Sequence, residues 1–181
     1  MAIPDISALN ADGLDETFLR QCIEENDISG IAYAANMYNF DMNFLPDTPD
    51  TSDAPETPLC LACKLGFLEA AKELVSWGAR LESYTDEEPS PLIWAAKNGH
   101  IEVVKWLVEQ GVDVNDYYEM TDNYGDIEWG ATALTEALAN GYIDIASILL
   151  NYGASPFING YREEINIADI QKKFWRLLWN Y

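Results

Sequence analysis

Regularly spaced glycines and prolines restrict the fold of this chain more than any other feature of its sequence. Segment 95–115 predicts two short antiparallel helices, because its apolar residues follow a helical period that breaks at Asn98-Gly99 and ends at Gly111. The same order of residues occurs in segments 57–69 and 131–144, and Pro58 and Pro91 lie about 33 residues apart. Units of this length bury their apolar faces by stacking on each other, so we expect a solenoid.

Each residue of the repeated pattern has a local physical role. Thr57 and Ser90 can cap a first helix by accepting a backbone hydrogen bond, and the proline after each occupies the first turn, where a missing N–H costs little. Gly66 and its equivalents supply the positive φ that ends the first helix. Small residues allow helices of neighbouring repeats to approach closely, namely Ala62, Ala95 and Ala137.

Residues 57–156 resemble ankyrin repeats, which implies an all-α solenoid of stacked helix–turn–helix units with extended finger loops. The resemblance is incomplete, because the histidine of the family's Thr-Pro-Leu-His motif is replaced in each repeat (Cys60, Ile93 and Thr135) and Ala133 replaces the third proline. A weaker copy precedes these repeats, since 18–28 aligns with 91–101 and 40–43 with 112–115. In that copy Asn26 stands at the inner glycine, and asparagine is the next residue able to adopt the left-handed conformation.

This comparison predicts one domain over 1–181. It contains a degenerate capping repeat at 14–45, an acidic proline-rich connection at 46–56, repeats at 57–89, 90–128 and 129–158, and a capping helix at 162–181. The apolar face of that last helix would shield the final repeat. The alternative is that it docks into a groove of a partner.

The chain is strongly acidic, with 31 Asp and Glu against 10 Lys and Arg and a net charge of −21. Direct binding of nucleic acid or of an anionic membrane is therefore disfavoured, because phosphate groups require Lys and Arg. A basic protein partner is favoured, with fast association that depends on salt. The alternative is that the acidity serves only solubility.

The acidic residues gather in the connections before the first helices, and two of these connections are about seven and nine residues longer than the family period. In ankyrin proteins such connections form fingers along one edge of the stack, which we call the finger edge (residues 46–56, 83–89 and 116–129). Tyrosines there offer rigid contact area, and carboxylates select cations. The alternative is that the aromatic residues pack on their own stack. The predicted partner-binding residues are Asp47, Asp53, Glu56, Tyr84, Asp86, Glu87, Tyr117, Tyr118, Glu119, Asp122, Tyr124, Asp126, Glu128 and Trp129. The inner helical face adds Glu24, Glu25, Lys64, Lys97, Asn98 and Asn140 as a secondary surface.

Catalysis has little support in the sequence. With His100 as the only histidine, a Ser-His or Cys-His triad of the usual kind cannot form, and we expect His100 to make a structural hydrogen bond. Cys22, Cys60 and Cys63 fall within first helices and are expected to be buried and reduced. The carboxylates between 116 and 128 could chelate calcium, but their spacing does not match the twelve-residue loop, so we expect no metal and no cofactor.

The sequence thus predicts a non-enzymatic, cytoplasmic binding protein that is a monomer when unbound. The function we favour is an acidic inhibitor or immunity protein that covers a basic surface, such as that of a nuclease toxin or another nucleic-acid-binding protein. An adaptor or secreted effector that recruits a host or cellular protein is the alternative, and an enzyme or metal-dependent module that uses the carboxylate-rich loop is a third. No uncharged apolar run has the length of a membrane span.

Overall fold

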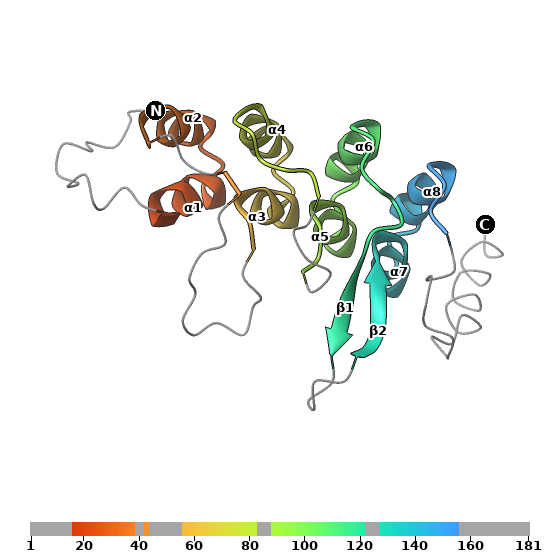
Figure 1. Ribbon diagram of the computed structural model, residues 1–181. Coiled ribbons are helices and arrows are strands. Elements are labelled where there is room, and N and C mark those ends of the chain that lie inside the picture. Colours follow the sequence, from red (N-terminus) through yellow and green to blue (C-terminus); the bar gives the residue numbers. More distant parts are fainter. Residues whose placement is uncertain (1–15, 39–41, 44–55, 83–87, 122–126, 156–181) are drawn as a thin grey trace.

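The computed structural model describes residues 16–38, 42–43, 56–82, 88–121 and 127–155. These residues form successive antiparallel helix pairs arranged in a row (Figure 1). The pairs are α1 (Glu16–Glu24) with α2 (Ile28–Tyr38), α3 (Pro58–Leu65) with α4 (Leu68–Ser76), α5 (Pro91–Lys97) with α6 (Ile101–Glu109), and α7 (Ala133–Ala139) with α8 (Ile143–Asn151). Within these residues, no helix has both the length and the apolar character that a membrane crossing requires.

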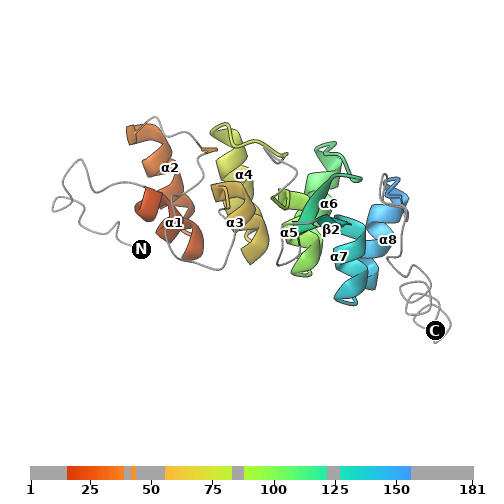
Figure 2. The ribbon, with the colours of Figure 1, turned by 60° about the horizontal axis from the view of Figure 1, so that its bottom comes forward.

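The helices form two layers. The first helices of the pairs, α1, α3, α5 and α7, lie side by side in an inner layer, and α2, α4, α6 and α8 lie behind them in an outer layer (Figures 1 and 2). Between the layers runs one hydrophobic core, in which equivalent leucines of successive repeats are buried. They are Leu59, Leu92 and Leu134 from inner helices and Leu74, Leu107 and Leu149 from outer helices. The predicted all-α repeat solenoid is confirmed.

The ends of the inner helices follow from their sequence. Thr57 caps α3, because its side chain accepts a hydrogen bond from the Cys60 N–H at 3.2 Å. Thr132 caps α7 in the same way and forms a reciprocal capping box with Thr135. Ser90 is in the N-cap conformation, but its hydroxyl makes no capping bond, so its predicted capping role is wrong. At that helix the proline that follows fixes the first turn instead.

The degenerate first repeat has the predicted conformation at its turn. Asn26 adopts a φ of 53°, the left-handed value that glycine has at the equivalent turns. The Asn26 N–H donates to the Ile23 carbonyl at 2.9 Å. Asparagine can therefore replace the turn glycine here, as its sequence position indicated.

A second correspondence lies in the segment after the outer helix. The Asn43 side chain donates to the Gly78 carbonyl at 3.1 Å and accepts from the Arg80 N–H at 2.7 Å, so it joins the first repeat to the next. Asn115 does the same between the third and fourth helix pairs, where it accepts from the Ser155 N–H at 2.6 Å. The alignment of segment 40–43 with 112–115 is therefore correct at its asparagine.

Candidate protein-binding surface

A two-stranded hairpin rises from the finger edge. Strands β1 (Tyr117–Thr121) and β2 (Ile127–Thr132) pair in antiparallel register, with Tyr117 opposite Thr132 and Glu119 opposite Gly130. The hairpin projects past the inner helices beside α7 (Figure 1). The long connection after α6 thus forms a finger, as the resemblance to ankyrin repeats implied.

Glu56 was predicted to contact a partner, but its side chain is occupied within the chain. The residue is 7% exposed, and its carboxylate lies 3.5 Å from Nη2 of Arg20 and 3.2 Å from Nζ of Lys64. Glu56 therefore links the inner helices α1 and α3 electrostatically. Its burial gives it a role in joining repeats, and its contact with a partner stays untested.

Tyr118 is also buried, with 6% of its surface exposed. Its hydroxyl donates to Oε1 of Glu136 at 2.8 Å, and Nζ of Lys97 lies 3.5 Å from that same carboxylate oxygen. Burial, followed by the adjacent Glu136 carboxylate, raises the pKa of Tyr118 well above its ordinary value, so the phenol remains a donor. Tyr117 and Glu119, on either side of it along β1, are partly exposed.

The other predicted partner-binding residues cannot be placed by their side chains. Glu128 and Trp129 belong to β2 by their backbone alone, and their side chains lie outside the described residues. Wholly outside lie Asp47, Asp53, Tyr84, Asp86, Glu87, Asp122, Tyr124 and Asp126, together with the predicted capping helix at 162–181.

The inner face contains a residue that sequence reasoning missed. Trp94 on α5 is partly exposed, and two ammonium groups lie near its ring: Nζ of Lys64 is 4.7 Å and Nζ of Lys97 5.6 Å from the ring centroid. Equivalent positions hold Leu61 on α3 and Glu136 on α7. The sequence feature that could have identified Trp94 is its position three residues before Lys97, in a repeat that follows one with Lys64 at the equivalent position.

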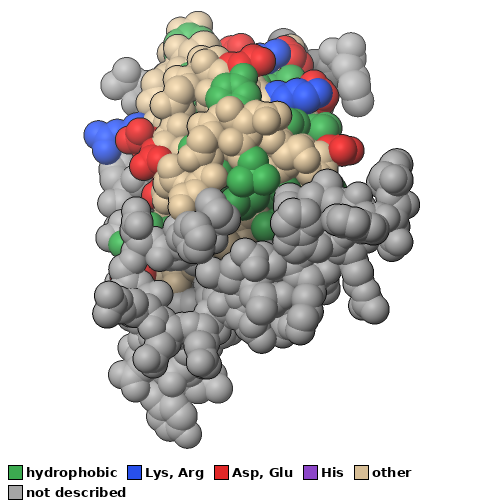
Figure 3. Space-filling model, turned by 90° about the vertical axis from the view of Figure 1, so that its right-hand side faces the viewer, with side chains coloured by type: hydrophobic (Ala, Val, Ile, Leu, Met, Phe, Trp, Pro, Cys, Tyr) green, Lys and Arg blue, Asp and Glu red, His purple; other side chains and the backbone are tan. Residues whose placement is uncertain are grey.

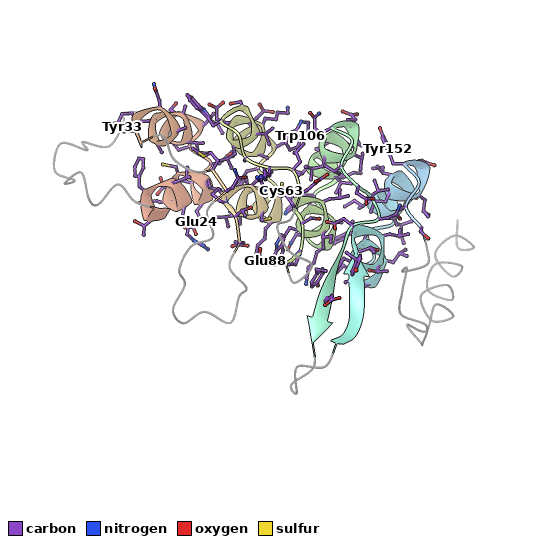
Figure 4. The ribbon with its side chains drawn as sticks, in the orientation of Figure 1. Glu24, Tyr33, Cys63, Glu88, Trp106 and Tyr152 are labelled. Carbon is purple, nitrogen blue, oxygen red and sulfur yellow. The ribbon has the colours of Figure 1, made fainter. Side chains whose placement is uncertain are left out.

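His100 and the cysteines have structural surroundings. The His100 Nε2 atom lies 2.8 Å from the Lys64 carbonyl, so the predicted structural hydrogen bond is confirmed. Cys22, Cys60 and Cys63 are buried and unbonded to each other, and Figure 4 shows Cys63 between the two helix layers. Burial raises the pKa of each thiol above its ordinary value. Within the described residues, no group of three His, Cys, Asp or Glu side chains is arranged to hold a metal ion.

Two further surfaces carry aromatic residues. Trp106 and Tyr152 lie on the outer layer, opposite the inner side on which Glu24 and Glu88 lie (Figure 4). At the far end of the described stack, Tyr142, Leu150 and Tyr152 are exposed, and Figure 3 shows hydrophobic side chains at the surface there.

Comparison with known proteins supports this description. The sequence matches the family model for ankyrin repeats (3 copies) over residues 10–118 and 84–160, which is more than half of the chain. The chain belongs to the ankyrin-repeat family. Ankyrin repeats indicate a protein–protein interaction module, and the family is typically non-enzymatic. A search of the curated proteins gave no match.

Proposed function

We propose that this ankyrin-repeat protein binds a basic protein through its finger edge and thereby blocks the basic surface that it covers. The observation that carries the proposal is the hairpin β1–β2, which projects from the stack and presents the partly exposed Tyr117 and Glu119. The chain has no Lys or Arg between Lys105 and Arg162, so every formally charged residue of this finger is acidic.

The net charge of −21 supports the same proposal. A field of one sign increases the rate at which an oppositely charged partner arrives, and salt reduces that rate. The partly exposed Tyr117, near the partly exposed Glu119, supplies contact area at a low cost in conformational entropy. The finger edge thus combines long-range attraction with a short-range contact surface.

The class of partner follows from the same chemistry. A protein that binds nucleic acid has a surface of Lys and Arg that receives phosphates. Carboxylates at the finger edge can occupy such a surface in place of phosphates. An enzyme that cleaves nucleic acids, or a toxin of that kind, is therefore the partner that we propose.

The test uses three forms of the purified protein as bait in a lysate of the source organism at moderate salt. One is the wild type. The second carries Asp86→Asn, Asp122→Asn and Asp126→Asn at the finger edge. The third is a charge-matched control with three neutralised acidic residues on the outer helices, Glu69→Gln, Glu109→Gln and Asp144→Asn.

We expect a basic protein to be retained by the wild type and by the outer-helix control, and to be lost by the finger-edge variant. Its nuclease or nucleic-acid-binding activity should fall when the wild type is added. A retained partner whose activity is unchanged by saturating wild type would contradict inhibition and favour the adaptor function. Equal retention by all three forms would contradict the finger edge as the binding surface.

A further inference from the structure

A cationic and aromatic surface occupies the inner face of this acidic protein, away from the tip of the hairpin. It consists of Lys64 on α3 and of Trp94 and Lys97 on α5, with the buried ring of Tyr118 on β1 next to Lys97, and we call it the lysine–tryptophan platform. Nζ of Lys97 lies 5.6 Å from the Trp94 centroid and 5.9 Å from the Tyr118 centroid, while Nζ of Lys64 lies 4.7 Å from Trp94. In Figure 2 the inner helices that carry this platform face the viewer.

The carboxylates that pair with these lysines are more buried than the lysines themselves. The side chain of Glu56 is 5% exposed and that of Glu136 is 12% exposed, whereas the side chains of Lys64 and Lys97 are 25% and 37% exposed. The negative charges therefore lie beneath the surface, and the ammonium groups lie nearer to solvent. An ammonium has three N–H donors. Nζ of Lys64 pairs with one carboxylate, and Nζ of Lys97 pairs with one carboxylate and lies 3.5 Å from the Tyr118 hydroxyl, so each ammonium keeps a donor for an outside group.

Other lysines of the described chain are arranged differently. Lys72 and Lys105 lie on outer helices and pair with carboxylates one turn away, and those carboxylates, Glu69 and Glu102, are 69% and 67% exposed. Each of those pairs presents both charges to water. Only on the inner face do two lysines of successive repeats converge on one aromatic ring, among the contacts of the described residues.

We propose that the lysine–tryptophan platform is a docking site for an acidic side chain of a protein partner, an Asp or Glu carboxylate that is followed or preceded by an apolar residue. The carboxylate would lie between the ammonium groups of Lys64 and Lys97, and the apolar neighbour would lie on the exposed part of the Trp94 ring. Charge complementarity selects this occupant, because two ammonium groups repel a cationic side chain and leave hydrogen-bond donors for an anion.

This preference is opposite in sign to that of the finger edge and does not depend on it. A partner whose basic surface also carries an acidic side chain would contact both surfaces, and the two signs of charge would fix its orientation. The platform would contribute specificity, because a partner without the acidic side chain leaves the lysine donors unpaired.

The probe is N-acetylglutamate methylamide, titrated into ¹⁵N-labelled full-length protein at low salt, with N-acetylglutamine methylamide as the uncharged control. The readout is the indole N–H resonance of Trp94, assigned by its loss in Trp94→Phe. We expect a saturable shift with a dissociation constant in the millimolar range and binding of the glutamine probe at least tenfold weaker. Added salt should weaken binding of the glutamate probe.

Two lysine variants locate the site. Lys97→Gln leaves the Tyr118 hydroxyl as a donor to Glu136, so we expect it to fold and to bind the glutamate probe at least tenfold more weakly. Lys105→Gln, on the outer layer, should bind as the wild type does. Equal shifts from both probes, or unchanged binding by a folded Lys97→Gln variant, would overturn the proposal.

The neutralised finger-edge variant separates this proposal from the proposed function. It should bind the glutamate probe as the wild type does, even though it loses the basic partner. Loss of the glutamate titration in that variant would show that the platform is not an independent site.

Discussion

Replacing Gly66 with alanine should destabilise the fold more than the same change at Gly141, although both glycines have nearly the same backbone conformation. Their φ angles are 78° and 80°. A Cβ at Gly66 would collide with the His100 ring of the next repeat, whereas a Cβ at Gly141 would meet no atom within 4 Å. The pair of variants therefore isolates the contact between one repeat and the ring that packs on it.

The structure sets the size of the difference. An alanine in the left-handed conformation costs about 1–2 kcal/mol at either site. At Gly66 the displaced His100 also loses its hydrogen bond to the Lys64 carbonyl, at about 0.5–1.5 kcal/mol, and crowding adds about 1–3 kcal/mol. We expect Gly66→Ala to lower the free energy of unfolding by about 3–6 kcal/mol and Gly141→Ala by about 1–2 kcal/mol.

Urea unfolding followed by circular dichroism measures both losses, and a double-mutant cycle with His100→Ala assigns the cause. In the His100→Ala background, the cost of Gly66→Ala should fall to that of Gly141→Ala. Gly99 is a second copy of the arrangement, because a Cβ there would lie 2.6 Å from the Tyr142 ring. Equal losses at Gly66 and Gly141, or additive effects in the cycle, would refute this reasoning.

Three further predictions concern the joints and the core. Glu82 occupies the position one repeat earlier that is equivalent to Asn115, whose side chain makes two hydrogen bonds to the following repeat. Glu82→Asn should therefore add two such bonds and raise the free energy of unfolding by about 1–2 kcal/mol in urea titrations. An unchanged urea midpoint would contradict this role of the asparagine. Tyr118→Phe should lower that free energy by about 1–3 kcal/mol, because the partly buried carboxylate of Glu136 on α7 loses a donor. A neutral result in the same titration would show that the bond contributes nothing. Burial raises the pKa of Cys22 to about 11 and of Cys60 to about 12, from an ordinary 9.0. The folded state therefore favours the neutral thiols, and their contribution is complete below pH 9 and is lost as pH rises through 11–12. Between pH 8 and pH 10.5, the urea midpoint of unfolding should fall further for the wild type than for Cys22→Ala. An equal fall in both proteins would contradict a contribution of the Cys22 thiol to this pH dependence.

The repeat pattern could be predicted because its signals are local. A proline at a first turn, a turn residue eight positions later and apolar residues at helical spacing each act within one helix pair. The same reasoning identified Asn26, whose side chain tolerates the left-handed conformation. The hairpin after α6 followed from the length of its connection and the family resemblance.

The burial of Glu56 and Tyr118 could not be predicted from the sequence in the same way. Glu56 is held by Arg20 and Lys64, which belong to two different repeats, so its environment exists only in the assembled stack. Neighbouring residues of a strand point to opposite faces, and Tyr117 and Tyr118 are equally good candidates for the buried face. The sequence does not say which tyrosine faces Glu136 on α7.

The inner face illustrates the same limit for charge. The sequence shows Lys64 and Lys97 one repeat apart, but the position of their counter-ions beneath them depends on packing between repeats. Trp94 could not be recognised as part of this surface, because the sequence does not show that its side chain remains partly exposed. A net charge of −21 therefore describes the whole chain and hides a local surface of the opposite preference.

The most direct test of the central claim is the association rate of the captured basic partner, measured by stopped flow over a range of salt concentrations. The triple variant at Asp86, Asp122 and Asp126 is compared with its charge-matched outer-helix control. We predict that the finger-edge variant associates at least tenfold more slowly at low salt, that the difference shrinks at high salt, and that the control stays close to the wild type. Equal slowing of both variants, or no slowing of either, would contradict binding through the finger edge.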